Sequence, residues 1–218
     1  LVRSRGLGDV YKRQGFAGSL LARLLALQGR DVLLVEKDRH PRFALGESST
    51  PLGNLVLERL AERYDQPDLR ELATHGRWLR HHPDLLRGLK RGFTFYRHRR
   101  GEPFRNGPDN EARLLVAASP DDEIADSHWL RSDVDAHFAA TARAAGAELS
   151  EETRLEEVDV RRDAVHLTGT RRGRPLRVTC DLVVDATGPG GFLAKRLPIP
   201  AHPRLGVPET GLVYGHFE

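Results

Sequence analysis

The stretch GFAGSLLARLLALQGRDVLLVE, residues 15–36, decides the fold class of this 218-residue chain. Leucines recur with helical spacing after Gly18 and the pattern ends at Gly29, which is typical of an amphipathic helix with a glycine stop. Residues 32–35 are then a continuous apolar run, as expected of a parallel strand covered on both faces. A turn, a helix and a buried strand in this order predict one unit of an α/β domain.

The small residues at the start of this helix indicate a dinucleotide-binding turn. The full motif has three glycines, of which the second lets the backbone approach a pyrophosphate and the third lets the helix pack on its strand. Gly15 and Gly18 stand at these second and third positions. Phe16 and Ala17 lie between them and belong to the same expected phosphate-binding turn. The helix N-terminus would offer backbone N–H groups and partial positive charge to the phosphates.

Glu36 ends the apolar strand eighteen residues after Gly18. A carboxylate at this place can accept hydrogen bonds from the ribose hydroxyls of an adenosine. Because it would repel a 2′-phosphate, FAD or NAD fits better than NADP. Lys37 follows directly and is expected at the same edge of the cofactor site. An ordinary strand and helix of an unrelated α/β protein is the alternative.

The residues before Gly15 do not read as the buried strand that such a unit requires. Residues 4–14 instead match, one by one, the translation of an adapter used to build sequencing libraries. We therefore expect residues 1–14 to be non-native and the true first strand to be missing. A natural basic N-terminal arm is the alternative. Residues 211–218 read as a strand with no turn after it, so the chain is expected to be a piece of a longer protein.

Composition excludes several classes of function. The net charge of the whole chain is +3, and residues 1–14 carry all of it. The rest of the chain is therefore neutral, and no nucleic-acid partner is expected. Cys180 is the single cysteine, which excludes an internal disulfide and favours a reducing cytoplasm. The ten histidines show no metal-binding spacing, and no metal site is expected. No apolar run is long enough to cross a bilayer, and no signal peptide is visible.

The segment DRHPRFALGESSTP, residues 38–51, resembles flavin-dependent halogenases and geranylgeranyl reductases, which are FAD-dependent oxidoreductases. In them a Gly-Glu-Ser loop follows the ribose-binding glutamate and leads into a helix beside the isoalloxazine. The residues to which the resemblance assigns cofactor contacts are Arg42, Gly46, Glu47 and Ser48. Ser48 and Thr50 can also cap a helix that begins near Pro51, with or without a flavin.

The segment DSHWLRSDVDAHF, residues 126–138, carries the same resemblance. We read it as the start of a helix that runs through Ala145 and stops at Gly146. Arg131 matches a family arginine that approaches the cofactor. A solvated arginine paired with Asp135, one helical turn on, is the alternative.

The segment CDLVVDATGPGG, residues 180–191, looks like the Asp-Ala-Ser/Thr-Gly signature of FAD-dependent oxidoreductases. In these proteins a strand returns to the dinucleotide domain, and small residues avoid a collision with the cofactor. The residues that the resemblance assigns to FAD are Asp185, Ala186, Thr187 and Gly188.

The segment GLKRGF, residues 88–93, resembles the place where flavin-dependent halogenases carry their catalytic lysine. In that family reduced flavin and oxygen turn halide into hypohalous acid. The lysine holds this oxidant, or becomes a haloamine, and passes halogen to an electron-rich aromatic. An amine suits this task because it donates a hydrogen bond or acts as a nucleophile, and burial lowers its pKa. The resemblance makes Lys90 the catalytic residue; a solvated basic cluster with Arg87 and Arg91 is the alternative.

These motifs together predict an incomplete α/β protein. Its core would be a Rossmann-like, three-layer FAD-binding domain of the glutathione reductase and aromatic hydroxylase type, with an inserted, mainly antiparallel substrate-side sheet. Strands are expected at residues 92–96 and 114–118, and an antiparallel meander over 158–178. The expected divisions are 1–14 (adapter-like), 15–54 (first part of the FAD domain), 55–125 (insertion), 126–200 (return of the FAD domain) and 201–218 (start of a further segment).

The function that the resemblance implies is FAD-dependent, halogenase-like oxidation of a small organic substrate. A separate flavin reductase is the family's expected partner. Two alternatives stay open at this point: a flavin-dependent reductase or hydroxylase without lysine chemistry, and an inactive truncated chain.

Overall fold

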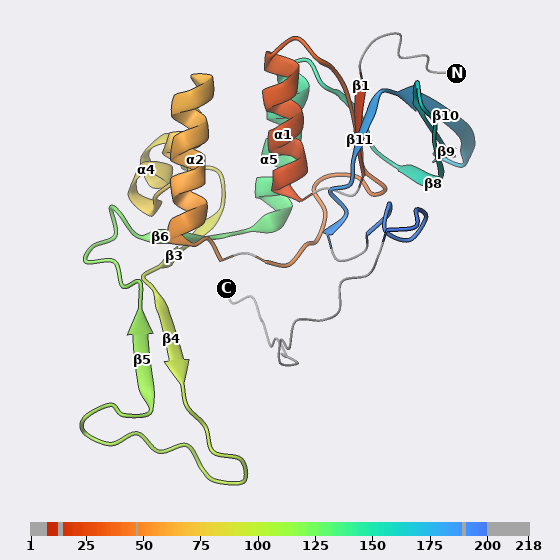
Figure 1. Ribbon diagram of the computed structural model, residues 1–218. Coiled ribbons are helices and arrows are strands. Elements are labelled where there is room, and N and C mark those ends of the chain that lie inside the picture. The colour runs from red at the N-terminus through yellow and green to blue at the C-terminus, as the bar shows by residue number, and fades with distance from the viewer. Residues whose placement is uncertain (1–7, 13–14, 47, 189–190, 200–218) are drawn as a thin grey trace.

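The structure is a computed structural model that describes residues 8–12, 15–46, 48–188 and 191–199 (Figure 1). A parallel sheet is covered by helices on one face and by an antiparallel meander on the other, which confirms the three-layer α/β prediction. The sheet has the order β11-β1-β2-β7. Its strands are β1 (Gly8–Lys12), β2 (Asp31–Val35), β7 (Glu148–Ser150) and β11 (Leu182–Val184). The covering helices are α1 (Phe16–Leu27) and α5 (Arg131–Ala144).

Strand β2 shows why residues 32–35 are all apolar. Val32 and Leu34 pack beneath the helices, where Ala22 of α1 and Ala142 of α5 meet them. Leu33 and Val35 point to the other face and pack against the meander. Because side chains alternate along a strand, burial of both faces requires an unbroken apolar run. The predicted parallel strand is therefore confirmed.

The expectation that no strand precedes Gly15 is wrong in the structure. Strand β1 lies between β2 and β11 and pairs in parallel with both, with Asp9 opposite Val32 on one side and Leu182 on the other. Parallel pairing uses backbone N–H and C=O groups, which every extended segment of non-proline residues carries. Residues 8–12 can therefore pair between β2 and β11 although their sequence lacks the apolar pattern of a buried strand. The adapter origin of residues 4–14 stays a prediction.

The meander contains three antiparallel strands in the order β10-β9-β8. They are β8 (Thr153–Val160), β9 (Val165–Arg171) and β10 (Arg174–Cys180). The tight turn between β9 and β10 consists of Arg172 and Gly173, whose φ angles of 49° and 74° are both positive. Such a two-residue turn matches the twist of paired strands. The predicted meander is confirmed.

The middle of the chain forms three helices and two separate antiparallel pairs of strands (Figure 1). The helices are α2 (Pro51–Tyr64), α3 (Pro67–Glu71) and α4 (His75–His81). Strand β3 (Arg87–Lys90) pairs with β6 (Asp126–Trp129), and β4 (Phe93–Tyr96) pairs with β5 (Arg113–Val116). The β4–β5 hairpin projects away from the other elements, and its strands lie close to the two predicted at 92–96 and 114–118.

Helix α5 begins later than predicted, because residues 126–129 form strand β6. Leu130 is extended, with φ −70° and ψ 100°, and the helix starts only at Arg131. The pairing partner of β6 lies about forty residues upstream in β3. Long-range backbone pairing here overrides the local helical pattern.

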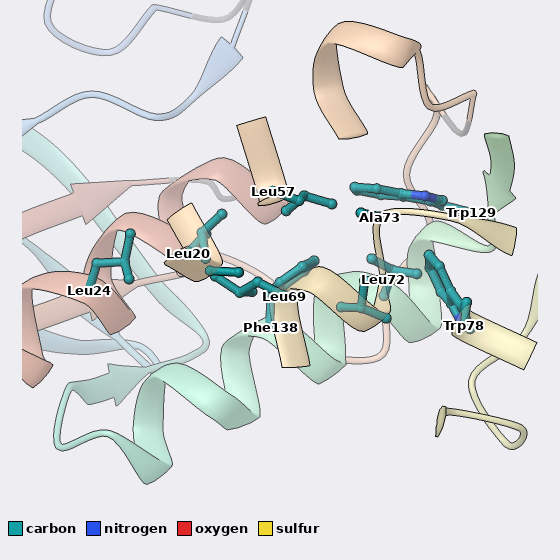
Figure 2. Close-up of a cluster of buried hydrophobic side chains, with 11 residues drawn as sticks. Leu20, Leu24, Leu57, Leu69, Leu72, Ala73, Trp78, Trp129 and Phe138 are labelled. Atoms are coloured by element: carbon teal, nitrogen blue, oxygen red, sulfur yellow. The ribbon is translucent and has the colours of Figure 1, made fainter. Parts of the chain in front are cut away.

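A buried cluster of leucines and aromatic rings joins the middle of the chain to α1 and α5 (Figure 2). Its buried members are Leu20, Leu24, Leu57, Ala61, Leu69, Leu72, Ala73, Trp78, Trp129, Val134 and Phe138. An ion pair reinforces the junction, since Arg23 of α1 lies 2.6 Å from Asp68 of α3. These contacts fix the helices α2–α4 beside α1 and α5.

Replacement of Leu34 by alanine tests the two-sided burial of β2. Leu34 has no exposed surface, so the change leaves a cavity and should lower the free energy of unfolding by about 3 kcal/mol. Leu182→Ala in the same sheet is the control, because that side chain is 55% exposed and its loss should cost about 0.5 kcal/mol or less. Urea unfolding followed by circular dichroism measures both; equal losses would contradict the layer arrangement.

Candidate functional site

A cleft of about 750 Å³ opens at the carboxyl ends of β1 and β11, where α1 begins. These two strands are neighbours in the sheet, and ligands of open α/β sheets bind in the crevice outside the carboxyl ends of the strands. The residues lining the cleft are Gly15, Phe16, Ala17, Gly18, Arg42, Phe43, Ala44, Leu45, Arg131, Asp185, Ala186, Thr187 and Gly188. The structure thus brings together ten of the sequence-predicted residues from four separate segments.

The N-terminus of α1 forms one wall of this cleft. Gly15 is the N-cap in an extended conformation, and no side chain caps the first turn or adds an acidic group to it. A Cβ on Gly15 would lie 3.1 Å from the nearest guanidinium nitrogen of Arg131, which is closer than most real contacts. Any other residue at this position would crowd the guanidinium where the helix end and the arginine meet. The helix dipole and Arg131 both favour an anion in this wall of the cleft.

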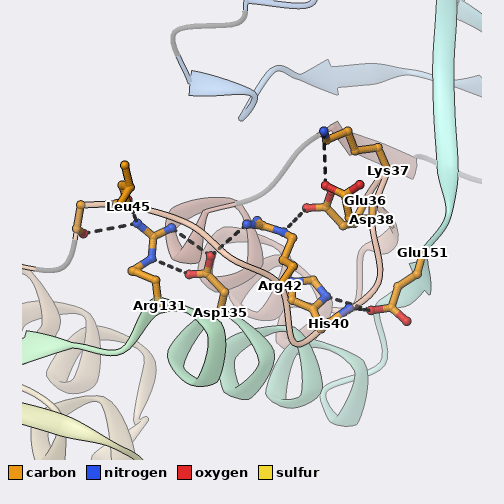
Figure 3. A network of polar contacts seen from close by, with 10 residues as sticks. Glu36, Lys37, Asp38, His40, Arg42, Leu45, Arg131, Asp135 and Glu151 are labelled. Atoms are coloured by element: carbon orange, nitrogen blue, oxygen red, sulfur yellow. Dashed lines mark hydrogen bonds and ion pairs between the residues drawn. The ribbon is translucent and has the colours of Figure 1, made fainter. Parts of the chain in front are cut away.

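Arg131 is held rigidly at the start of α5 (Figure 3). Its Nε and one terminal nitrogen donate to the two carboxylate oxygens of Asp135, each at 2.9 Å. The other terminal nitrogen donates to the carbonyl oxygen of Leu45 at 2.7 Å. Arg131 is 7% exposed and Asp135 is 1% exposed. The pairing that the sequence alternative anticipated is present, but the arginine is buried at the cleft rather than solvated.

Glu36 lies behind this wall and does not line the cleft. Its carboxylate is fully buried and accepts from Arg42 Nε at 2.9 Å and from the backbone N–H of Asp38 at 3.0 Å. Arg42 also lies 3.5 Å from Asp135, so charges alternate from Glu36 through Arg42 and Asp135 to Arg131 (Figure 3). Glu36, the residue predicted at the ribose edge, therefore does not line the cleft, whereas its partner Arg42 does.

Lys37 is placed away from the cleft as well. Its ammonium lies 3.3 Å from the carboxylate of Asp38, and the pair is partly exposed. Lys37 therefore does not lie with the other predicted cofactor-binding residues at the cleft.

The Asp185 turn also lines the cleft. Asp185 accepts from the backbone N–H groups of Thr187 at 3.0 Å and Leu193 at 2.7 Å, and Thr187 Oγ1 accepts from the N–H of Phe192 at 3.0 Å. Burial would raise the pKa of Asp185, but these hydrogen bonds outweigh it and hold the pKa below its ordinary value. The ionised side chain shapes the turn, and Gly188, with φ at +63°, completes it.

A second, apolar cleft of about 640 Å³ lies beside the first, between α1 and α2. Gly46 and Ser48 line this cleft, while Glu47 lies outside the described residues. Thr50 caps α2 as predicted, accepting from the N–H of Gly53 at 3.1 Å. Ser48 instead bonds His128 Nδ1 at 3.0 Å. The two clefts share Phe16 and Ala17.

Lys90 lies at the end of β3 and is 4% exposed, so it is not a member of a solvated basic cluster. Its amine donates to the carbonyl oxygen of Ser49, which lines the apolar cleft. Asp126 Oδ2 lies 3.6 Å from the same amine. Burial lowers the pKa of Lys90 below its ordinary value, against the raising effect of Asp126. A buried amine is thus placed on the far side of the Ser49 loop from the apolar cleft.

Several lining and supporting residues were missed from the sequence. Phe43, Ala44 and Leu45 line the first cleft because the loop before Gly46 folds across it, and no sequence pattern marks such a path. Asp135 was visible as an ion-pair partner four residues after Arg131, yet its burial was not. Among the described residues, no three His, Cys, Asp or Glu side chains gather as a metal site requires.

The chain is similar in sequence and in structure to flavin-dependent halogenases over most of its length. Monodechloroaminopyrrolnitrin halogenase PrnC of Pseudomonas fluorescens is 30% identical over 189 residues, 87% of this chain and 32% of that protein. Tetracycline 7-halogenase of Kitasatospora aureofaciens is 30% identical over 190 residues, again 87% and 32%. The structure of halogenase PltM in complex with phloroglucinol and FAD matches with a TM-score of 0.72 and 26% identity.

The PltM match covers 87% of this chain and 36% of PltM. The chain likewise spans about a third of the length of the two curated relatives, PrnC and tetracycline 7-halogenase. No protein-family model matches the chain.

Replacement of Arg131 by glutamine tests the buried pair. The change leaves the buried carboxylate of Asp135 with only Arg42 nearby and should lower the free energy of unfolding by about 3 kcal/mol. Arg161→Gln is the matched control, since its pair with Asp159 is exposed and should contribute less than about 0.5 kcal/mol. Chemical denaturation of both variants measures the difference, and two equal values would show that the Arg131 pair is solvated.

Proposed function

We propose that this chain supplies the FAD-binding part of a flavin-dependent halogenase. The observation that carries the proposal is the convergence of the α1 N-terminus, Arg131 and the Asp185 turn on one cleft. The 30% identity to two halogenases over most of the chain supports the same function.

The residues of the cleft fit the diphosphate of FAD. The uncapped N-terminus of α1 and the guanidinium of Arg131 supply backbone donors and positive charge, and the absence of a side chain at Gly15 leaves room beside them. The Asp185 turn lines the same cleft. We place the ribose near Arg42 and Glu36, and the flavin ring toward Gly46 and the apolar cleft.

FAD in its reduced form supplies the activation of oxygen. We propose Lys90 as the catalytic residue, because its amine is buried and donates a hydrogen bond to Ser49, a residue that lines the apolar cleft. Its amine would hold hypohalous acid by a hydrogen bond, or exchange an N–H proton for its halogen with release of water. The halogen would then pass to an aromatic carbon of the substrate, which loses its proton. Catalysis by a reductase or hydroxylase without lysine chemistry is the second candidate, and the similarity to halogenases favours the first.

The proposed substrate is a small electron-rich aromatic, and the proposed partner is a separate flavin reductase. PltM has been solved with phloroglucinol, a small aromatic of this kind. Cys180 is buried and is the single cysteine of the sequence, so we place the protein in a reducing compartment such as the cytoplasm. Neutral charge outside residues 1–14 argues against a nucleic-acid partner. In the described part of the chain, no helix combines the length and apolar character needed to span a bilayer.

Titration of the purified chain with FAD tests the proposal. The wild-type chain should bind FAD, seen as a change in flavin fluorescence and absorbance. Gly15→Val should weaken binding by at least about tenfold, because the added carbons collide with Arg131 and narrow the phosphate wall.

Ala140→Val is the control, since it introduces the same branched side chain on the exposed side of α5 and should leave binding unchanged. A folded wild-type chain that leaves the flavin spectrum unchanged contradicts the proposal. Equal weakening by both variants would show that the cleft at Gly15 is not the site.

A further inference from the structure

Groups from three parts of the chain contact the amine of Lys90. The carbonyl oxygen of Ser49 accepts its hydrogen bond from the loop before α2. The ring of Phe93, at the start of β4, has its centroid 3.6 Å from the amine nitrogen, within the range of a cation–π contact. Asp126 Oδ2 of β6 lies at 3.6 Å. Asp126 is the acid whose charge acts on the amine, and it is itself hydrogen-bonded to the neutral Asn54 of α2.

Asp126 occupies an unusual place for a carboxylate. It is 4% exposed, and the antiparallel register sets it directly opposite Lys90. Its Oδ1 accepts from Asn54 Nδ2 at 2.6 Å. Its Oδ2 is buried and has no hydrogen-bond partner among the described residues. A buried carboxylate oxygen without a partner is costly unless a charge of opposite sign compensates it.

We infer that Asp126, oriented by Asn54, is a positioning residue for the amine of Lys90. Its free oxygen holds the ammonium form between the Ser49 carbonyl and the Phe93 ring. The importance of this for catalysis rests on the function proposed above, whereas the contact itself does not. Asn54 is a partly exposed residue of α2, yet its side-chain amide donates to the buried carboxylate of Asp126. This contact is the observation that gives Asn54 its orienting role.

The neighbouring charged groups do not compete for the amine. Arg91 forms a surface ion pair with Asp122, and Arg87 donates to the backbone carbonyls of His82, Pro83 and Leu85. Burial favours the neutral amine and Asp126 favours the ammonium. Removal of the Asp126 charge should therefore lower the pKa of Lys90 further, whereas unfolding should raise it to the ordinary lysine value.

Nuclear magnetic resonance of the full chain labelled with ¹³C-lysine tests the inference without cofactor or activity. The sequence contains four lysines, Lys12, Lys37, Lys90 and Lys195, so four Cε signals are expected and Lys90→Arg assigns one of them. Asp126→Asn should lower the titration midpoint of Lys90 by about one pH unit or more. Asp122→Asn removes an equal charge from the surface and should leave the midpoint unchanged.

Two further variants make the test decisive. Asp126→Glu keeps the charge and should restore most of the wild-type midpoint, while Asn54→Ala should lower it by less than Asp126→Asn. An unchanged or raised midpoint in folded Asp126→Asn overturns the inference. If that variant does not fold, Asn54→Ala decides in the same way. Absence of FAD binding with the expected lysine shifts would overturn the proposed function and leave this inference standing.

Discussion

The buried ion pair between Arg131 and Asp135 is the interaction on which the rest of the site depends. It fixes the guanidinium at the first turn of α5, beside Gly15 at the first turn of α1. Through Leu45 and Arg42 it also ties the loop before Gly46 across the cleft. Removing one partner of such a pair is costly because the other charge is left buried. One electrostatic unit thus sets the positions of three chain segments that a dinucleotide would touch.

The structure separates two tasks along the chain. The cleft proposed for the diphosphate is lined by ends of regular elements, which carry fixed partial charges. Lys90 lies in β3, which pairs with β6. Its amine contacts the loop of Ser48 to Thr50 through the carbonyl oxygen of Ser49. This loop also lines the apolar cleft, so a flavin ring and a substrate would approach Lys90 from that side.

Much of the fold could be predicted because its signals are local. The leucine spacing after Gly18, the apolar run of β2 and the paired strands of the meander each follow from short-range periodicity. The Asp185 turn was marked by its small residues. The strand β6 was missed because its partner lies far away in the sequence, and the place of β1 in the sheet depends on backbone pairing rather than on side-chain pattern. The burial of Glu36 behind Arg42 and the pairing of Asp126 with Lys90 depend on loop path and strand register, which one sequence does not display.

The most direct test of the central claim is to map backbone amide shifts in the ¹⁵N-labelled chain during titration with ADP, the diphosphate half of the proposed cofactor. The account predicts the largest shifts at Gly15, Ala17, Gly18, Arg131 and residues 186–188, with none on the β4–β5 hairpin. Shifts centred on the hairpin or on α4, or none at all at a saturating concentration, would contradict it.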